Sequence, residues 1–436
     1  MSAVRGDRAA ADAAMQRPHV VFLARDLLMG GAERAYLDYV NHLERFQPVA
    51  VLGRRDGTLL GELKSDIPLF DLSVRGPASG GLTGAARTAI GDEAAGGFTP
   101  RSLARLVAEC HRLNRVLRLT GASLVSSFLM RSHLIALLTR RWLRPDLRVV
   151  INVHEHMTES AGHLYPTRVD RRLMRWITRN LFPQADGIVV VADALRQDLI
   201  RNFDTPPALI TVAHNPVDLC AIRRKAQEEV TECEFPRDGS PVVIAVGRLV
   251  KLKGFAVLIH AFARLPPALR AQLVIVGGGP DRAALEKLVA DLGLHGTVVF
   301  AGLQRNPWKF MARAQVFALS SLTEAFPSVI GEALALGLPV VAADCSAGVR
   351  EYLKGTHHGL LVPPGDVAAL AAALAQLLGD ARLRSTLAER GPARMAELDL
   401  PIVVERYEDV LAGVMPASST AVDAGLRRAP SAADAE

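Results

Sequence analysis

Two acidic residues, Glu324 and Glu332, stand in a stretch whose order of residue types suits the binding of a polyhydroxylated ligand. An apolar run precedes Glu324, helix-forming residues surround Glu332, and Gly337-Leu338-Pro339 separates them from a second apolar run. This order predicts a strand, a loop, a helix, a turn and another strand. In an open parallel sheet the loop lies at the carboxyl end of its strand, where ligands bind. Carboxylates there accept hydrogen bonds from neighbouring hydroxyl groups.

Two other interpretations of these glutamates are open at this point. A glutamate at the start of a helix often only caps the helix or complements its dipole. A pair of carboxylates is also typical of the acid and base of a hydrolase. The residues that neighbour the two glutamates in the fold distinguish between these roles.

A cluster of cations follows an earlier apolar run. Gly247-Arg248 comes directly after that run, and Lys251 and Lys253-Gly254 open the next predicted helix. Lysine at a helix amino end opposes the helix dipole unless an anion is bound there. These residues therefore predict a phosphate site, and beside it Glu324 and Glu332 are better interpreted as holders of sugar and ribose hydroxyls.

Glycines follow two other predicted strands. Gly277-Gly278-Gly279 resembles a dinucleotide-binding loop, but Arg282 stands where the third glycine of that fingerprint belongs, so a nicotinamide cofactor is not predicted. A tight turn that leaves room for a nucleotide is the better interpretation. In the first half, Met29-Gly30-Gly31 precedes a predicted helix, where glycine allows close approach of a ligand to the backbone.

Two histidine-containing segments end strands of the first half. Val153-His154-Glu155-His156 has the spacing of neither a HExxH helix nor a three-ligand zinc site, so no metal is predicted. His214-Asn215-Pro216-Val217-Asp218 is expected to turn the chain toward a linker, which is a structural role.

Short apolar runs alternate with longer amphipathic segments along most of the chain. This alternation predicts parallel sheets with helical crossovers, and its division into two series predicts two α/β domains facing across a cleft. The strands predicted for the first domain are His19–Ala24, Val49–Gly53, Pro68–Leu72, Ser123–Phe128, Val149–Val153, Gly187–Val191 and Leu209–Ala213. Those for the second are Val242–Val246, Gln272–Val276, Thr297–Ala301, Gln315–Leu319, Pro339–Ala342 and Gly359–Val362.

The composition of the intervening segments gives the domain boundaries. The sequence predicts an acceptor domain and a donor domain joined by a charged linker, a last helix that packs back on the first domain, and disordered ends. The acceptor domain is predicted to span residues 18–222, with a mobile loop at about 73–99, and the donor domain residues 241–399. The linker is 223–240, the last helix is 400–414, and the disordered ends are 1–17 and 415–436.

Bulk composition limits the classes of function. Half of the 436 residues are hydrophobic, but the first twenty residues lack an apolar segment, so no signal peptide is expected. No run is long enough to predict a membrane-spanning helix. The four scattered cysteines are expected to be reduced, which indicates a cytoplasmic protein. The net charge of +6 lies in residues 1–222, with 28 Lys and Arg against 22 Asp and Glu.

Arginine recurs along two predicted helices, at 101–118 and 168–179. The simpler interpretation of each is a solvated helix face, and the alternative is a surface that meets anionic membrane lipid or a phosphorylated acceptor. Nucleic acid is not an expected partner, because aromatic residues are few and no nucleic-acid-binding module is present.

Taken together, these motifs resemble those of the retaining glycosyltransferases of family 4, which have the GT-B fold of two Rossmann-like domains. The similarity extends almost from end to end. The matching segments are GGAER, VHEH, HNPVD, GRLVKLKGF, VGGGP, EAFPSVIGEALALGLPVVA and GLLVPPGD.

The resemblance implies a role for each site residue. Arg248 and Lys253 would bind the donor diphosphate, Glu324 would hold sugar hydroxyls and Glu332 the ribose, and His154 would lie near the reacting carbon. The catalytic residues implied are Arg248, Lys253, Glu324 and His154. The other donor-binding residues implied are Gly30, Gly31, Gly247, Gly277, Gly278, Phe326, Pro327, Ser328, Val329, Ile330 and Glu332.

The same resemblance implies a reaction. A hexose or N-acetylhexosamine would pass from a nucleotide-diphospho-sugar, with UDP favoured, to a glycan acceptor, which the basic first domain suggests is lipid-linked. No cofactor or metal is implied, and the protein would act in the cytoplasm or on the inner face of the cytoplasmic membrane. The alternatives are a non-hydrolysing nucleotide-sugar epimerase of the same architecture and a non-catalytic sugar-nucleotide-binding subunit.

Overall fold

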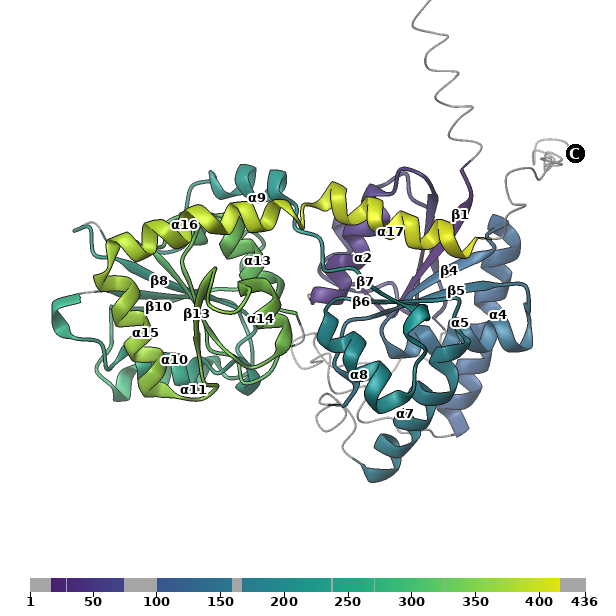
Figure 1. Cartoon of the computed structure of the whole chain (residues 1–436), viewed down its shortest axis with the longest axis horizontal. Helices are drawn as coiled ribbons and strands as arrows, with labels where there is room; N and C mark the ends of the chain where they lie inside the picture. The colour runs from purple at the N-terminus through teal and green to yellow at the C-terminus, as the bar shows by residue number, and fades with distance from the viewer. Residues whose placement is uncertain are drawn as a thin grey trace, which may run out of the picture.

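The fold is given by a computed structural model that describes residues 17–28, 30–73, 100–158, 167–236, 238–269, 271–324 and 326–415. The predicted disordered ends, apart from Arg17 and Met415, and the predicted loop after Ser73 lie outside these residues. Two parallel sheets, each covered by helices on both faces, make up the described chain (Figure 1).

The first sheet has seven parallel strands in the order β3-β2-β1-β4-β5-β6-β7. The chain direction is the same in every strand, so all carboxyl ends lie at one edge. The strands are β1 (His19–Ala24), β2 (Gln47–Leu52), β3 (Leu69–Asp71), β4 (Leu124–Phe128), β5 (Arg148–Val153), β6 (Gly187–Val190) and β7 (Ile210–Val212).

Alternate side chains of these strands enter different clusters. Val21 and Leu23 pack with the helices of one face, whereas Val20 and Phe22 pack with those of the other. The first face is covered by α4 (Pro100–Thr120), α5 (Met130–Trp142), α7 (Arg168–Leu181) and α8 (Asp193–Phe203). The second is covered by α2 (Gly31–His42) and α17 (Leu400–Val414) (Figure 1).

The second sheet has six parallel strands in the order β10-β9-β8-β11-β12-β13. The strands are β8 (Val242–Val246), β9 (Gln272–Val276), β10 (Val298–Gly302), β11 (Val316–Leu319), β12 (Val340–Ala343) and β13 (Gly359–Val362). One face is covered by α10 (Phe255–Phe262), α11 (Arg282–Asp291) and α15 (Val367–Gly379). The other is covered by α12 (Trp308–Met311), α13 (Ser328–Ala335), α14 (Ala347–Leu353) and α16 (Ala381–Ala396).

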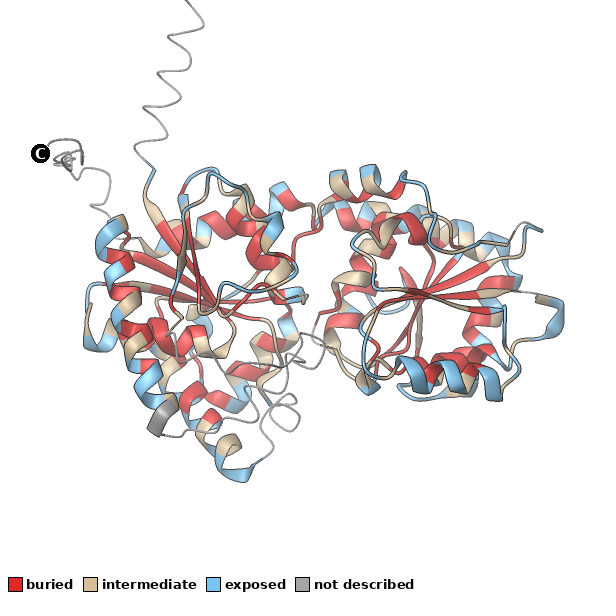
Figure 2. Ribbon diagram, turned by 180° about the vertical axis from the view of Figure 1, so that it is seen from behind, coloured by how far each residue is buried: buried red, intermediate tan, exposed pale blue. Residues whose placement is uncertain are grey.

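The predicted α/β fold with two parallel sheets is confirmed. Every predicted strand is present with its ends within two residues of the predicted ones. The reason is visible in the burial of the strands, most of which are apolar and covered on both faces (Figure 2). Strands of this kind give continuous apolar runs in the sequence.

The chain crosses between the two sheets twice, and the two crossings are hydrogen-bonded together. Val217 N–H donates to the carbonyl of Leu398 at 3.0 Å, and Leu400 N–H donates to the carbonyl of Val217 at 3.1 Å. Helix α9 (Leu219–Ala226) follows the first crossing, so the first residues of the predicted linker are helical. After the second crossing, α17 returns to the first sheet.

Helix α17 is held there by aromatic contacts. The ring of Tyr407 stacks on Tyr39 of α2 with centroids 3.9 Å apart, and its hydroxyl bonds to Ser126 of β4. Glu408 accepts the backbone N–H groups of Glu44 and Arg45 at 2.7 and 2.6 Å. The last helix therefore ties the end of the second domain to the body of the first.

Candidate active site

The predicted phosphate site and the first glutamate are in direct contact. A 3-10 turn (Lys251–Lys253) follows β8, and the ammonium group of Lys253 bonds to the carboxylate of Glu324 in the loop after β11. Ser321 Oγ donates to the same oxygen of Glu324 at 2.7 Å. Lys253 and Glu324 are predicted to hold different parts of the donor, and the structure shows that their side chains are in contact. The two roles stay predictions.

Two further contacts fix these loops against one another. Ser320 Oγ donates to the carbonyl of Lys253 at 3.0 Å. Gly254 has a φ of +63°, and a Cβ atom there would lie 2.0 Å from the carbonyl oxygen of Ser320. Only glycine fits this position without strain. The place of Lys253 is thus set by packing as well as by charge.

Arg248 is exposed in the loop after β8. Its charge acts on an acidic residue, Glu33, to which the sequence interpretation assigned no role. Glu33, in the first turn of α2, folds back so that a Cβ atom at Gly30 would meet its Oε2 at 2.3 Å. Burial raises the pKa of Glu33 to about 7, although its own N–H and the positive charge of Arg248 favour the ionised form. The side chain of Glu33 therefore lies over Gly30, whereas Gly31 is exposed.

The amino ends of α2 and α13 lie next to each other. A Cβ atom at Gly31 would be 3.8 Å from Ser328 Oγ and 3.9 Å from Asn215 Nδ2. Asn215 Nδ2 lies 3.5 Å from Ser328 Oγ, in hydrogen-bond contact. Helix α13 has Pro327 at its N-cap without a side-chain cap, so its first N–H groups are not satisfied by a capping side chain.

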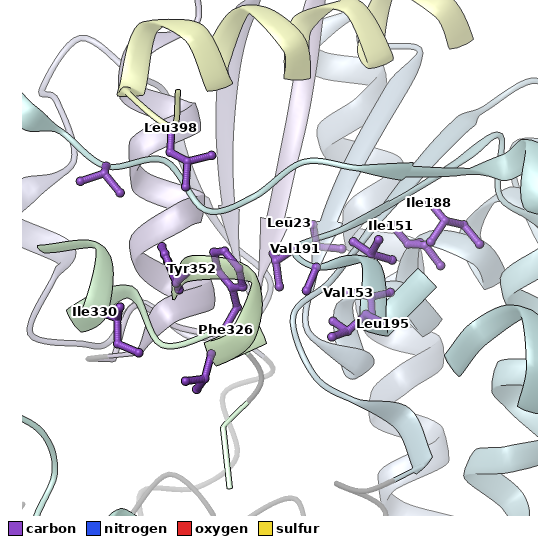
Figure 3. Packing of buried hydrophobic residues seen from close by; sticks show 14 of the residues in the cluster. Leu23, Ile151, Val153, Ile188, Val191, Leu195, Phe326, Ile330, Tyr352 and Leu398 are labelled. Carbon is purple, nitrogen blue, oxygen red and sulfur yellow. The ribbon is translucent and has the colours of Figure 1, made fainter. Parts of the chain in front are cut away.

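The loop that precedes α13 is anchored by its aromatic side chain. Phe326 is 5% exposed and stacks on Tyr352 at a centroid distance of 4.0 Å (Figure 3). The ring of His214 lies 5.1 Å from that of Phe326. Ile330 is fully buried, whereas Ser328 and Val329 are half-buried. Ile330 N–H donates to the carbonyl of Pro327 at 3.0 Å, so the backbone N–H groups that this segment can offer to a ligand are those of Ser328 and Val329.

The second glutamate has different neighbours from the first. Trp308 Nε1 donates to Glu332 Oε2 at 2.9 Å. Burial raises the pKa of Glu332, while the indole N–H and the charge of Arg34 oppose the rise. Glu332 lines a pocket of about 200 Å³ together with Arg34, Asp38, Lys225 and Trp308. Glu324 and Glu332 therefore have separate partners, Lys253 and Trp308, and their assignment to sugar and ribose hydroxyls stays a prediction.

The glycine loop after β9 has a packing role. Gly277 has a φ of +153°, and a Cβ atom there would lie 1.8 Å from the carbonyl oxygen of Gly247. This close approach of the loops after β8 and β9 requires glycine with or without a ligand. At Gly278 a Cβ atom would meet only the Cβ atom of Leu303, at 3.4 Å, so the assignment of Gly247, Gly277 and Gly278 to the donor stays a prediction.

His154 follows β5 in the first domain. Its ring lies 5.6 Å from Phe128, and burial lowers its pKa to about 4, so the ring is neutral at pH 7. Its Nδ1 is buried without a hydrogen-bond partner. The contacts of His154 that the structure shows are with the first domain, and its predicted place beside the reacting carbon stays a prediction.

The side chain of the neighbouring His156 pairs with a carboxylate. Its Nδ1 lies 3.2 Å from Oδ2 of Asp198 on α8. Within the described residues, no three His, Cys, Asp or Glu side chains are grouped in a way that could bind a metal ion.

The structure adds residues that the sequence interpretation did not assign to the site. Ser320 and Ser321 follow the apolar run of β11 directly, which is a local signal. Glu33 lies two residues after the predicted glycines, which is also local. Trp308 of α12 reaches Glu332 of α13 across 24 residues of the chain, and no pattern in the sequence indicates that contact.

The fold and the site together define a class of protein. Two parallel α/β domains, with a cation and an acid in contact at the carboxyl ends of the second sheet, have the architecture of the GT-B fold. The structure of HepE from Anabaena in complex with UDP and glucose matches with a TM-score of 0.69, covering 90% of this chain and 99% of HepE at 21% identity. This likeness establishes the fold.

The sequence comparisons identify the family. The model described as Glycosyltransferase Family 4 matches residues 29–220, and that described as Glycosyl transferases group 1 matches residues 227–394. The chain is 32% identical over 272 residues, 62% of its length, to the N-acetylgalactosamine-N,N'-diacetylbacillosaminyl-diphospho-undecaprenol 4-alpha-N-acetylgalactosaminyltransferase of Campylobacter jejuni, of which 71% is covered. It is also 39% identical over 180 residues to the lipopolysaccharide core biosynthesis glycosyltransferase LpsE of Rhizobium meliloti, covering 41% of this chain and 52% of LpsE. The chain belongs to glycosyltransferase family 4.

Proposed function

We propose that the protein transfers a hexose or N-acetylhexosamine from a UDP-sugar to a lipid-linked glycan, with retention of anomeric configuration, in cell-surface polysaccharide biosynthesis. The observation that supports it most is the contact between Lys253 and Glu324 at the carboxyl ends of β8 and β11. A cation for the diphosphate and an acid for the sugar are thus neighbours. The names of the relatives in Campylobacter jejuni and Rhizobium meliloti support the acceptor class, and the UDP complex of HepE supports the donor.

In the proposed reaction, the bond between the anomeric carbon and the diphosphate oxygen breaks, and a bond from that carbon to the acceptor oxygen forms on the same face. The acceptor proton passes to a diphosphate oxygen. Positive charge develops on the sugar and negative charge on the leaving diphosphate, so positioned cations lower the barrier. Arg248 and Lys253 supply that charge, as a divalent ion does in metal-dependent transferases.

The remaining residues hold the two substrates. Glu324 accepts hydrogen bonds from the sugar, Glu332 accepts them from the ribose, and the amides of 326–330 and of Gly30 and Gly31 approach the phosphates. Neutral His154 lies beside the reacting carbon from the acceptor domain. In this division residues 241–399 bind the donor and residues 18–222 bind the acceptor.

A lipid-linked acceptor requires that the first domain approach a membrane. None of the helices in the described part of the chain is long and apolar enough to cross one. Helix α7 has an exposed face with Arg168, Arg172 and Arg175, from which Val169 and Trp176 also project, being 73% and 57% exposed. Arginine together with an exposed tryptophan suits anionic headgroups, so we assign this face to the inner surface of the cytoplasmic membrane.

The donor is testable by binding. UDP is expected to raise the melting temperature of the purified protein more than GDP or ADP at equal concentration, because a ligand that binds only the folded state stabilises it. A screen of UDP-, GDP- and ADP-sugars by thermal shift and by slow donor hydrolysis then names the sugar. Stabilisation by no nucleotide at millimolar concentration would contradict the proposal.

The membrane surface is tested by vesicle binding. Arg172→Glu with Arg175→Glu is expected to weaken binding to phosphatidylglycerol vesicles at low salt by about 100-fold or more, because each charge near an anionic surface contributes about 1 kcal/mol. Arg382→Glu with Arg390→Glu on α16 makes the same charge change in the other domain and is the control. Equal weakening by both pairs, or no binding by the unmodified protein, would contradict the assignment.

A further inference from the structure

The amino end of α8, in the first domain, is capped by a side chain from the second domain. Glu351 of α14 accepts the backbone N–H of Asp193 at 3.1 Å and that of Ala194 at 3.2 Å. Helix α8 has Ala192 at its N-cap, which offers no side-chain acceptor of its own. A carboxylate at a helix amino end satisfies free N–H groups and complements the dipole.

A third partner completes this contact. His214 Nε2 lies 3.2 Å from Oε2 of Glu351. Burial alone would raise the pKa of Glu351, but the hydrogen bonds from His214 and from the two backbone N–H groups outweigh it and hold the pKa below its ordinary value. Glu351 is therefore ionised near neutral pH, as a cap requires.

The same turn of α14 contacts the loop that leads into the predicted donor site. Tyr352, next to Glu351, stacks on Phe326 (Figure 3). His214 packs against the same ring. Phe326 lies two residues after Glu324. The cap on α8 and the anchor of the donor loop are thus adjacent.

Another carboxylate of α8 holds the loop after β5. Asp198 is 4% exposed and accepts the backbone N–H of Thr158 at 3.1 Å, the hydroxyl of Thr158, and Asn202 Nδ2 at 2.7 Å. Its Oδ2 also lies 3.2 Å from Nδ1 of His156. These hydrogen bonds outweigh the effect of burial and lower the pKa of Asp198 to about 2.

The loop held by Asp198 begins at His154. A series of contacts extends from Phe326 through Tyr352 and Glu351 to the amino end of α8. Further along α8, Asp198 continues the series to the His154 loop. Packed and hydrogen-bonded contacts of this kind transmit position between sites. Nothing else in the proposed mechanism uses Glu351 or Asp198.

We propose that α8 aligns the two halves of the active site, with Glu351 and Asp198 as positioning residues that set the place of His154 relative to the donor loop. Glu351 fixes the helix to the donor domain, and Asp198 fixes the His154 loop to the helix. Neither residue touches substrate. This inference rests on the proposed function, which places the donor beside 324–330 and the reacting carbon beside His154.

A purely structural role for these residues predicts a different result. If they only stabilised the fold, Glu351→Gln and Asp198→Asn would lower the melting temperature and leave the kinetics of the folded enzyme unchanged. If they position the His154 loop, they lower kcat while UDP affinity stays the same, because the residues that bind the nucleotide are untouched.

The experiment compares these variants with matched controls. Glu351→Gln is expected to lower kcat by about 10-fold and Asp198→Asn by about 100-fold, with the Kd for UDP changed by less than about 2-fold. Glu397→Gln, on the same domain as Glu351, and Asp204→Asn, at the far end of α8, remove exposed carboxylates that contact neither the His154 loop nor the donor loop. Both are expected to leave kcat unchanged. The double variant is expected to lose little more than Asp198→Asn alone, because both changes release one helix.

A second readout does not depend on activity. The amide of Thr158 donates to Asp198, so hydrogen exchange at this amide is expected to be faster in Glu351→Gln at an unchanged melting temperature. Unchanged exchange at Thr158, or a loss of kcat that multiplies in the double variant, would overturn the inference. Failure of the unmodified enzyme to transfer any sugar would instead overturn the proposed function, and the exchange result would still decide the role of α8.

Discussion

Lys253→Ala is expected to lower kcat for sugar transfer by about 10²- to 10³-fold, the cost of removing one positioned group that stabilises developing charge. Lys253 is half-buried beside Glu324, in surroundings where a charge is screened less than at the open surface. Its ammonium group is the cation that the structure shows in contact with the predicted sugar-binding acid. Steady-state kinetics with the donor found by screening measures the effect.

The control for Lys253→Ala is Lys287→Ala on α11, where the exposed lysine pairs with Asp291 one turn away. This change removes the same charge from the same domain and is expected to leave kcat unchanged. Circular dichroism of both variants shows whether the fold is intact. An undiminished kcat in Lys253→Ala would show that Lys253 does not stabilise the leaving group.

Glu324→Ala and Glu332→Ala are expected to fail in different ways. Glu324→Ala removes the holder of the sugar, so transfer falls by about 100-fold while UDP itself, which lacks the sugar, binds with little change. Glu332→Ala removes the holder of the ribose, so the Kd for UDP rises by about 10- to 100-fold. The contrast follows from their separate partners, Lys253 for Glu324 and Trp308 for Glu332.

Isothermal titration with UDP and kinetics with the UDP-sugar separate the two results. Trp308→Phe is a useful companion, because it keeps an aromatic ring on α12 while removing the donor to Glu332 Oε2. It is expected to resemble a mild form of Glu332→Ala. Weaker UDP binding in Glu324→Ala than in Glu332→Ala would reverse the assignment of the two glutamates.

The strands were predictable because each forms an apolar run long enough to cross a buried parallel sheet. Val242–Val246 and Gln272–Val276 were predicted with the ends that the structure shows. The carboxyl ends of such strands share one edge, so the order of motifs along the chain was enough to bring Lys253 and Glu324 to the same place. Local pattern and topology therefore predicted this part of the site.

Contacts between loops and between domains were not predictable in this way. The hydrogen bond of Trp308 to Glu332 joins residues 24 positions apart, and the cap that Glu351 places on α8 joins residues 158 positions apart. The folding of Glu33 over Gly30 depends on side-chain burial at the amino end of α2. None of these has a periodicity or spacing of its own, because each is decided by tertiary packing.

The most direct test of the account is the product of a single transfer. With the donor selected by screening, an acceptor glycan and excess EDTA, the enzyme is expected to release UDP and to form a new linkage with the anomeric configuration of the donor, as read from the coupling constant of the anomeric proton. That result would mean that the charges of Arg248 and Lys253 stabilise the leaving diphosphate without a metal ion. An inverted linkage, or loss of transfer on chelation, would contradict the account.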